Sequence, residues 1–353
     1  MRKFLVVALI VALAATSLVG CGQNDAPEAG GDQPRELVVS TFGLSDDIIT
    51  RDVFKPFEEA HNVRIVAEVG TAAERFTRLE SNPNSNVDVI ELSQSTAARG
   101  YEAGLFAKID YSQLENGDKL IDSAAAIVEK GYGPPYVINS MGIIYDKEAA
   151  GMEITEWADL WNPILEGKIS IPDITTTFGP SVVHVASDYK GVDIKSDDGA
   201  AAFEALVELE PNVVKTYARS SDLANMFTSG EIAVAIVGDF AIPMIQGAAP
   251  QVEYVVPDSG TYANFNTIDV NANSENMDLA LKFIDWRLSG DLQATTAVTL
   301  NEAPVNREVV LDGETAENKT YGEIAEKAKS VDYEFVNPLM QQWIDQWNRT
   351  LNQ

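Results

Sequence analysis

The chain has 353 residues, of which 45% are hydrophobic and 8% aromatic, so it can bury a sizeable core in two or three domains and is neither a fibre nor wholly disordered. It carries 25 Lys and Arg residues against 54 Asp and Glu residues, a formal charge of −29. Nucleic-acid binding needs a basic face for the phosphates, so this balance argues against a nucleic-acid partner. One cysteine and two histidines leave little material for a disulfide or a His-based site, and we expect no metal and no cofactor.

The first 20 residues have the pattern of a signal peptide. Arg2 and Lys3 form a positively charged n-region. Residues 4–15 are an apolar run that is too short for a membrane span but has the length of a signal-peptide h-region. The residues Leu-Val-Gly at 18–20 then precede Cys21, and this string resembles the lipobox of bacterial lipoproteins. The resemblance implies cleavage before Cys21, lipid on that residue and attachment to the outer face of the bacterial cell membrane. The alternative is an ordinary cleaved signal with an incidental thiol.

A flexible tether is expected from the lipidated cysteine to the folded body, over residues 21–36. The segment 22–36 is rich in Gly, Pro, Asp, Glu and Gln, and its apolar side chains are two alanines. Such a composition cannot offset the entropy lost on ordering. Removal of the signal leaves 23 basic and 54 acidic residues, a formal charge of −31.

From residue 36 onward, short β-branched segments alternate with segments of helical period. The expected strands lie at 37–40, 63–66, 87–92, 142–145, 168–171, 232–237, 252–256 and 267–270. Helical stripes are expected around Val53 and Phe57, from Met277 to Leu288, and over 336–351, where we expect Trp343 to be packed in the core. Alternating strands and helices predict mainly parallel sheets covered on both faces, and the length predicts two α/β lobes.

Ligands of parallel sheets bind beyond the carboxyl ends of the strands. This rule selects the segments 41–43, 93–95, 172–177, 238–240 and 264–266 as candidate binding loops.

The order of these pieces resembles the extracellular solute-binding proteins of ATP-driven importers, in the branch that includes spermidine/putrescine receptors. The resemblance covers nearly the whole mature chain and depends on order and spacing. The matching pieces are Ser40-Thr41-Phe42, Phe54-Lys55-Pro56-Phe57, Val87-Asp88-Val89-Ile90, Met141-Gly142-Ile143-Ile144-Tyr145, Trp157-Ala158-Asp159-Leu160-Trp161, Thr228-Ser229-Gly230-Glu231, Gly238-Asp239 and Ala303-Pro304-Val305-Asn306.

The resemblance implies an α/β fold with two lobes, the type II periplasmic-binding-protein-like fold, with a ligand cleft that closes by hinge motion. We expect lobe 1 at 37–139 plus 265–310, lobe 2 at 140–264, and C-terminal helices at 311–353 that pack on the lobes. It also implies a monomer that binds a small molecule and partners an ABC permease and its ATPase, and that is not an enzyme.

The candidate ligand-binding residues follow from the binding loops and the resemblance: Thr41, Phe42, Ser93, Gln94, Ser95, Tyr136, Thr175, Thr176, Thr177, Asp239, Asn264 and Asn266. Polyamine receptors of this family hold aliphatic chains with aromatic rings and amines with carboxylates. Asp239 is the candidate carboxylate, although helix capping explains it equally well. The three threonines suit an anionic group, with helix capping as the alternative, and we expect Asp173 to hold their loop. Ser95, Asn264 and Asn266 depart from the polyamine pattern.

The function expected from these features is a lipid-anchored receptor that captures a small polar solute, with a polyamine-like organic cation favoured. A small anionic or polar solute and ferric iron are alternative cargoes. Two other classes stay open at this point: a secreted carboxylate-dependent hydrolase, and a surface adhesin or scaffold.

Overall fold

The computed structural model describes residues 34–43, 45–129 and 133–351, and the chain from Arg35 onward forms one compact unit. The predicted signal peptide, the lipidation site Cys21 and most of the tether lie outside the described residues. Within the described part, no helix is both long and apolar enough to cross a bilayer.

The first lobe is built on three parallel strands, β1 (Arg35–Thr41), β2 (Val63–Val69) and β3 (Val89–Ser93). In β1, Leu37 and Val39 face one buried cluster, while Val38 faces another on the opposite side of the sheet. A strand buried on both faces is typical of a parallel sheet covered by helices on each side, as the sequence predicts. These helices are α1 (Asp46–Ile49), α2 (Lys55–His61), α3 (Ala72–Ser81), α4 (Gln94–Glu102), α5 (Asp122–Glu129), α11 (Met277–Leu288) and α12 (Gly290–Thr299).

The second lobe repeats this plan with parallel strands β5 (Ile169–Pro172), β6 (Val213–Tyr217) and β7 (Val234–Gly238). The short strand β8 (Glu253–Val255) lies at its other edge and pairs with β4 (Pro135–Tyr145). The helices of this lobe are α6 (Lys147–Ala150), α7 (Gly179–Lys190), α8 (Ala200–Leu209), α9 (Ser221–Thr228) and α10 (Ile242–Ala248).

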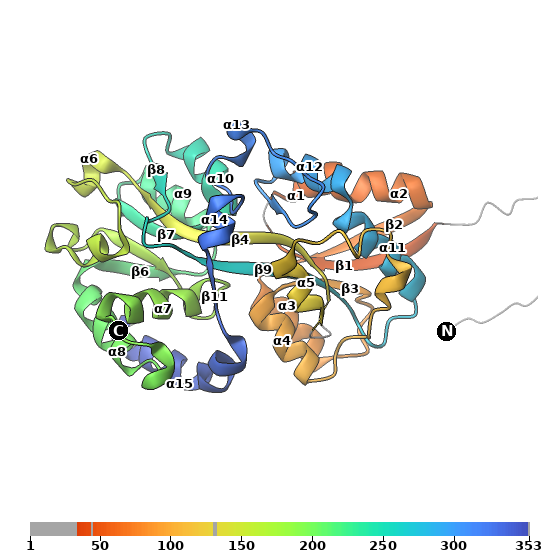
Figure 1. Cartoon of the computed structure of the whole chain (residues 1–353), viewed down its shortest axis with the longest axis horizontal. Helices are drawn as coiled ribbons and strands as arrows, with labels where there is room; N and C mark the ends of the chain where they lie inside the picture. The colour runs from red at the N-terminus through yellow and green to blue at the C-terminus, as the bar shows by residue number, and fades with distance from the viewer. Residues whose placement is uncertain (1–33, 44, 130–132, 352–353) are drawn as a thin grey trace, which may run out of the picture. The chain divides into compact units, whose positions relative to one another are not determined.

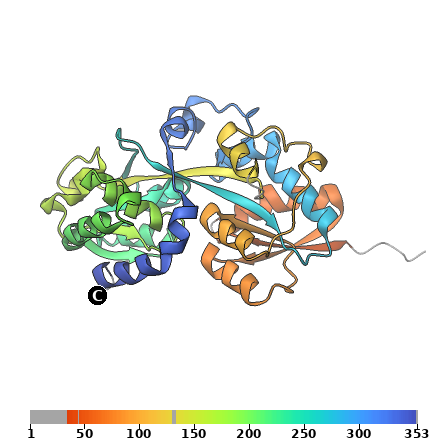
Figure 2. The same ribbon diagram turned by 60° about the horizontal axis from the view of Figure 1, so that its bottom comes forward.

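Two long strands, β4 and β9 (Tyr262–Val270), cross between the lobes (Figures 1 and 2). The N-terminal part of β4 pairs with β9 as far as Ser140, and from Met141 onward β4 pairs with β7. Strand β9 in turn pairs with β3 of the first lobe, so β9 is antiparallel to its neighbours β3 and β4 in the first sheet, and β4 is antiparallel to its neighbours β7 and β8 in the second. The two-lobe α/β fold expected from the sequence is therefore confirmed, and the joint between the lobes is a pair of neighbouring strands.

The C-terminal segment crosses back over this joint. After β10 (Ala303–Pro304), the chain forms α13 (Gly313–Ala316), α14 (Glu323–Lys327) and β11 (Lys329–Ser330), and β11 pairs with β9 (Figure 1). We call residues 311–332 the strap. The last helix, α15 (Tyr333–Leu351), buries Trp343 and Trp347 in the core of the second lobe, as its apolar stripe predicts. The finer lobe boundaries expected at 139/140 and 264/265 stay predictions.

One expectation about the crossing strands is wrong. We expected 264–266 to form a loop beyond the carboxyl end of a strand, but these residues lie inside β9. Asn264 and Asn266 are polar, so this part of β9 lacks the alternation of apolar residues from which a strand is predicted. The first half of β4 was not predicted as a strand for the same reason.

Candidate functional site

A cavity of about 440 Å³ lies between the lobes and is lined by residues of both. We call its two sides the lobe-1 wall and the lobe-2 wall. The lobe-1 wall includes Thr41, Phe42, Asp46, Glu91, Ser93, Tyr136, Asn266, Arg287 and Glu302. The lobe-2 wall includes Thr175, Thr176, Thr177, Phe178, Tyr217, Arg219, Ser220, Ser221, Gly238 and Phe240. This volume is within the range of pockets that enclose small organic molecules.

Most of the residues proposed from sequence meet at this cavity. Those that line it are Thr41, Phe42, Ser93, Tyr136, Thr175, Thr176, Thr177 and Asn266. They come from the ends of β1, β3 and β5 and from the two crossing strands. The rule that ligands bind beyond the carboxyl ends of parallel strands therefore selected residues that line the cavity. Their contact with a ligand stays a prediction.

Gln94, Ser95 and Asn264 are not among the residues that line the cavity. Gln94 is the first residue of α4, and the Ser95 hydroxyl lies 3.2 Å from that of Ser93. Asn264 is fully buried on β9 and donates from Nδ2 to Oδ1 of Asn266 at 2.9 Å. Ser95 and Asn264 therefore contact the wall residues Ser93 and Asn266.

Asp239 also lies outside the cavity lining, and its carboxylate is bound to the strap. Its Oδ2 accepts hydrogen bonds from the backbone N–H of Thr320 at 3.0 Å and from the Thr320 hydroxyl at 2.6 Å. The alternative capping role is not seen either, because α10 begins at Ile242 and its N-cap residue is Ala241. Complete burial raises the pKa of Asp239 to about 7, against the lowering effect of the hydrogen bonds from Thr320.

The three threonines form a turn on the lobe-2 wall that Asp173 holds, as expected. The Asp173 carboxylate accepts from the backbone N–H and the hydroxyl of Thr175, at 3.0 and 2.6 Å. The hydroxyl of Thr176 donates to the Asp173 carbonyl at 2.7 Å. Threonine capping of the next helix is wrong, because Phe178 is the N-cap residue of α7 and no side-chain cap is formed.

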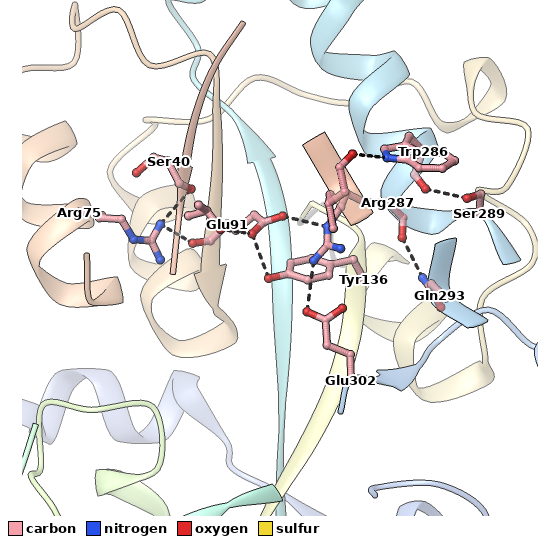
Figure 3. A network of polar contacts seen from close by, with 11 residues as sticks. Ser40, Arg75, Glu91, Tyr136, Trp286, Arg287, Ser289, Gln293 and Glu302 are labelled. Carbon is pink, nitrogen blue, oxygen red and sulfur yellow. Dashed lines mark hydrogen bonds and ion pairs between the residues drawn. The ribbon is translucent and has the colours of Figure 1, made fainter. Parts of the chain in front are cut away.

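The central polar group of the lobe-1 wall is formed by Arg287, Glu91 and Glu302, which were not among the candidates from sequence, together with Thr41 and Tyr136, which were. Arg287 Nε donates to Glu91 Oε1 at 2.9 Å, and Arg287 Nη2 lies 3.4 Å from Glu302 Oε1 (Figure 3). The guanidinium lies over the ring of Tyr136, 4.0 Å from its centroid. The other carboxylate oxygen of Glu91 accepts from the hydroxyls of Thr41, at 2.6 Å, and Tyr136, at 3.3 Å.

The sequence contains signals for two of these residues. Glu91 is the charged residue of the buried strand Val89–Ser93, where an ionised side chain requires a partner. Arg287 lies three residues after Ile284 and directly before Leu288, on the buried side of α11. The pairing itself spans 196 positions and cannot be read from local pattern.

Burial and mutual attraction set the charges of this group. Burial raises the pKa of Glu302, and Arg287 opposes that rise. Burial also opposes the charge of Arg287, but Glu91 and Glu302 outweigh it and hold the pKa of the guanidinium above its ordinary value. Arg75 lies behind Phe42, with its guanidinium bonded to the carbonyls of Ser40, Gly70 and Glu91 (the bonds to Ser40 and Glu91 appear in Figure 3).

The lobe-2 wall is aromatic where it faces the end of β7. The rings of Phe178 and Phe240 are stacked, with centroids 6.4 Å apart and planes within 15°. Both rings lie against Gly238, where a Cβ atom would approach them to 2.5 and 2.6 Å. Glycine is required at this position because any side chain would push the rings apart.

The described part of the chain contains no group of three His, Cys, Asp or Glu side chains that could hold a metal ion. His184, the histidine of α7, is buried and packs against Tyr262 and Trp343, as expected for a core residue.

Two α/β lobes on either side of a small-molecule cavity, joined by crossing strands, define the class of two-lobe solute-binding proteins. Comparison with known families agrees: the model of the bacterial extracellular solute-binding protein family matches residues 52–323. The chain belongs to this family, whose members bind solutes for ABC importers.

Relatives in both sequence and structure support this membership. The spermidine/putrescine-binding periplasmic protein 1 of Haemophilus influenzae is 25% identical over 306 residues, 82% of this chain and 81% of its own. The spermidine/putrescine-binding periplasmic protein of Escherichia coli is 24% identical over 268 residues, 73% of this chain and 75% of its own. The crystal structure of an ABC transporter from Clostridium perfringens superimposes on this chain with a TM-score of 0.77 and a sequence identity of 51%. The match covers 89% of this chain and 99% of the Clostridium perfringens chain.

Proposed function

We propose that this protein is a lipid-anchored receptor that captures a small amine-bearing solute and delivers it unaltered to an ABC permease. Lipid at Cys21 attaches it to the cell membrane, and closure of the two lobes encloses the solute. The relatives named for spermidine and putrescine support an amine-bearing cargo, the class to which polyamines belong.

The observation that carries the proposal is the pairing of carboxylates with aromatic rings at one cavity. Glu302 and Glu91 lie on the lobe-1 wall with Tyr136, and Phe178 and Phe240 lie on the lobe-2 wall. A charged hydrogen bond contributes about 1.5–3 kcal/mol, and an ammonium over a ring contributes about 0.5–2 kcal/mol. A few such contacts supply most of the roughly 8 kcal/mol that micromolar binding requires.

Calorimetric titration of the mature protein against a panel of amines, amino acids and organic acids tests the capture of a solute. We expect saturable binding of one amine-bearing class at one site per chain. Glu302→Gln should weaken that binding at least about ten-fold, because it removes the negative charge of a carboxylate at the lobe-1 wall. Absence of binding across the whole panel, with a folded protein, would contradict the proposal.

The anchor has a separate test. We expect Cys21→Ser to abolish incorporation of labelled palmitate and to move the protein from the membrane fraction to the medium or the periplasmic fraction. The matched control is Ser17→Ala, which changes a neighbouring residue and leaves the lipobox cysteine in place. Membrane retention of Cys21→Ser would show that the attachment has another cause.

We also propose that the cavity performs no catalysis. A hydrolase of this kind needs a pair of carboxylates. Of the three that line the cavity, Glu91 and Glu302 are both bound to Arg287, which leaves Asp46 without a second free carboxylate among the lining residues. Solute recovered after incubation with the protein should be chemically unchanged by mass spectrometry.

A further inference from the structure

The charges of the cavity are divided unequally between its two walls. The lobe-1 wall has three carboxylates, those of Asp46, Glu91 and Glu302, and one guanidinium, that of Arg287. Arg75 adds a second guanidinium behind Phe42. The formal balance on this side is therefore one negative charge, which suits a cationic group of the ligand.

The lobe-2 wall is the more positive of the two, although Asp173 lies next to its lining with its carboxylate bound to Thr175. Among the described residues that line this wall, Arg219 carries the charged side chain. The other polar groups of the wall are hydroxyls and backbone groups. Two helices also begin at this wall: α7 follows Phe178, and α9 starts at Ser221. Neither has a side-chain cap, so their first N–H groups add partial positive charge. Helix α4 begins at the lobe-1 wall in the same way, but there the carboxylates outweigh it.

Among the described residues Arg219 forms an ion pair with Glu74, and this pair is weak. Its Nη2 lies 3.7 Å from Glu74 Oε1 of α3, with both side chains more than half exposed. Exposed ion pairs of this kind contribute about 0–1 kcal/mol. Arg219 can therefore turn to an anionic group inside the cavity at little cost.

We propose that the cargo is zwitterionic: its amine binds at the lobe-1 wall, and an anionic group at its other end binds Arg219 and the hydroxyls of the lobe-2 wall. This inference rests on the proposed function and narrows its substrate class. A diamine satisfies the lobe-1 wall equally well, but its second ammonium lies beside Arg219, where like charges repel in a partly desolvated site. A carboxylate at that position gains charge-assisted hydrogen bonds instead.

A matched ligand series tests the proposal by calorimetry. It consists of ω-amino acids of three to six carbons, the diamines of the same lengths and the corresponding monocarboxylates. We expect one ω-amino acid to bind at least about ten-fold more tightly than either the diamine or the monocarboxylate of its length. A diamine that binds as tightly as every ω-amino acid, or failure of the whole ω-amino acid series, would overturn the inference. Binding of another amine in the wider panel would still leave the receptor function standing.

Two variants separate recognition from closure of the lobes. Arg219→Gln should weaken the ω-amino acid at least about ten-fold and leave the diamine unchanged or slightly tighter. Glu74→Gln removes the partner of Arg219 across the cavity and should keep the preference for the ω-amino acid. Equal losses for both ligands in both variants would mean that Arg219 only ties the lobes together, which contradicts the proposal.

Discussion

At the scale of single residues, the cavity depends on a buried group in which one guanidinium holds two carboxylates. The side chains of Arg287 and Glu91 are 4% and 5% exposed, so neither charge is screened by water. A buried pair of this kind gives little net stability, but removal of one partner leaves an uncompensated charge. The arrangement therefore fixes the positions of Glu302 and Tyr136 at the wall of the cavity.

Arg287→Met should lower the free energy of unfolding by about 3–5 kcal/mol, because Glu91 then stays buried without its partner. Urea denaturation followed by circular dichroism measures the loss. Glu91→Gln combined with Arg287→Met should recover part of it. Arg35→Gln is the matched control, since its exposed pair with Asp278 should change stability by less than about 1 kcal/mol. A loss as small as that of the control would show that the buried group is dispensable.

The residue scale also shows what the sequence could not reveal. Thr41, Phe42 and Ser93 were found because they lie at the carboxyl ends of strands whose apolar pattern is clear. Asp239 was chosen by the same rule, yet its side chain turns to Thr320, 81 positions away, and not to the cavity. Glu91, Arg287 and Glu302 come together only through the tertiary fold, and a rule based on strand ends does not select residues inside strands or helices.

At the scale of elements, the joint between the lobes is the decisive feature. Strand β4 changes partner between Ser140 and Met141, and this is where the strap is attached. The hydroxyl of Thr320 lies 2.8 Å from that of Ser140 and donates to Asp239. The most β-branched parts of both crossing strands were predicted from sequence, but their extensions were not, because they carry polar residues that the pattern assigns to loops.

The stability of this attachment should depend on pH through Asp239. Its pKa is about 7 in the folded protein and lower in the unfolded chain, so the folded state binds more protons between about pH 4 and 7. The contribution of Asp239 to stability is therefore present at low pH and is lost as pH rises towards 7. Lys319 and Tyr254 are the charged or titratable neighbours whose pKa values respond to Asp239.

Asp239→Asn should become more stable relative to the unmodified protein as pH rises from 4.5 to 7.5. Chemical denaturation at several pH values measures this difference, and Asp258→Asn, which changes an exposed carboxyl, should show a flat difference. A flat difference for Asp239→Asn as well would mean that its carboxyl titrates at its ordinary pKa.

At the scale of the whole molecule, a ligand that bridges the two walls favours the closed arrangement of the lobes. The lobe-1 wall has the carboxylates, and the lobe-2 wall has Arg219, the hydroxyls and the rings of Phe178 and Phe240, so neither lobe alone satisfies the solute. The two-lobe organisation was predicted from the alternation of elements and from the family resemblance. The charge difference between the walls was not, because it depends on which side chains face inward.

Saturating amounts of the preferred solute should reduce the radius of gyration measured by small-angle X-ray scattering. At a solute concentration near the Kd of the unmodified protein, Glu302→Gln should show a much smaller reduction, because its affinity is at least about ten-fold lower. An unchanged radius for the unmodified protein at saturation would mean that binding does not move the lobes.

The position of β9 also sets an order in which the molecule can be completed during synthesis and export. This strand lies between β3 and β4 in the sheet of the first lobe, although it is separated from β3 by 169 positions. Most of the first lobe is synthesised early, but its sheet stays incomplete until residues 262–270, which form β9, have been synthesised. The strands β5, β6 and β7 of the second lobe emerge before that, but the core of this lobe waits for Trp343 and Trp347 of α15, the last helix. Neither lobe is therefore complete until the last part of the chain has emerged, and a nascent chain that stops short of β9 exposes an open sheet edge to chaperones and proteases.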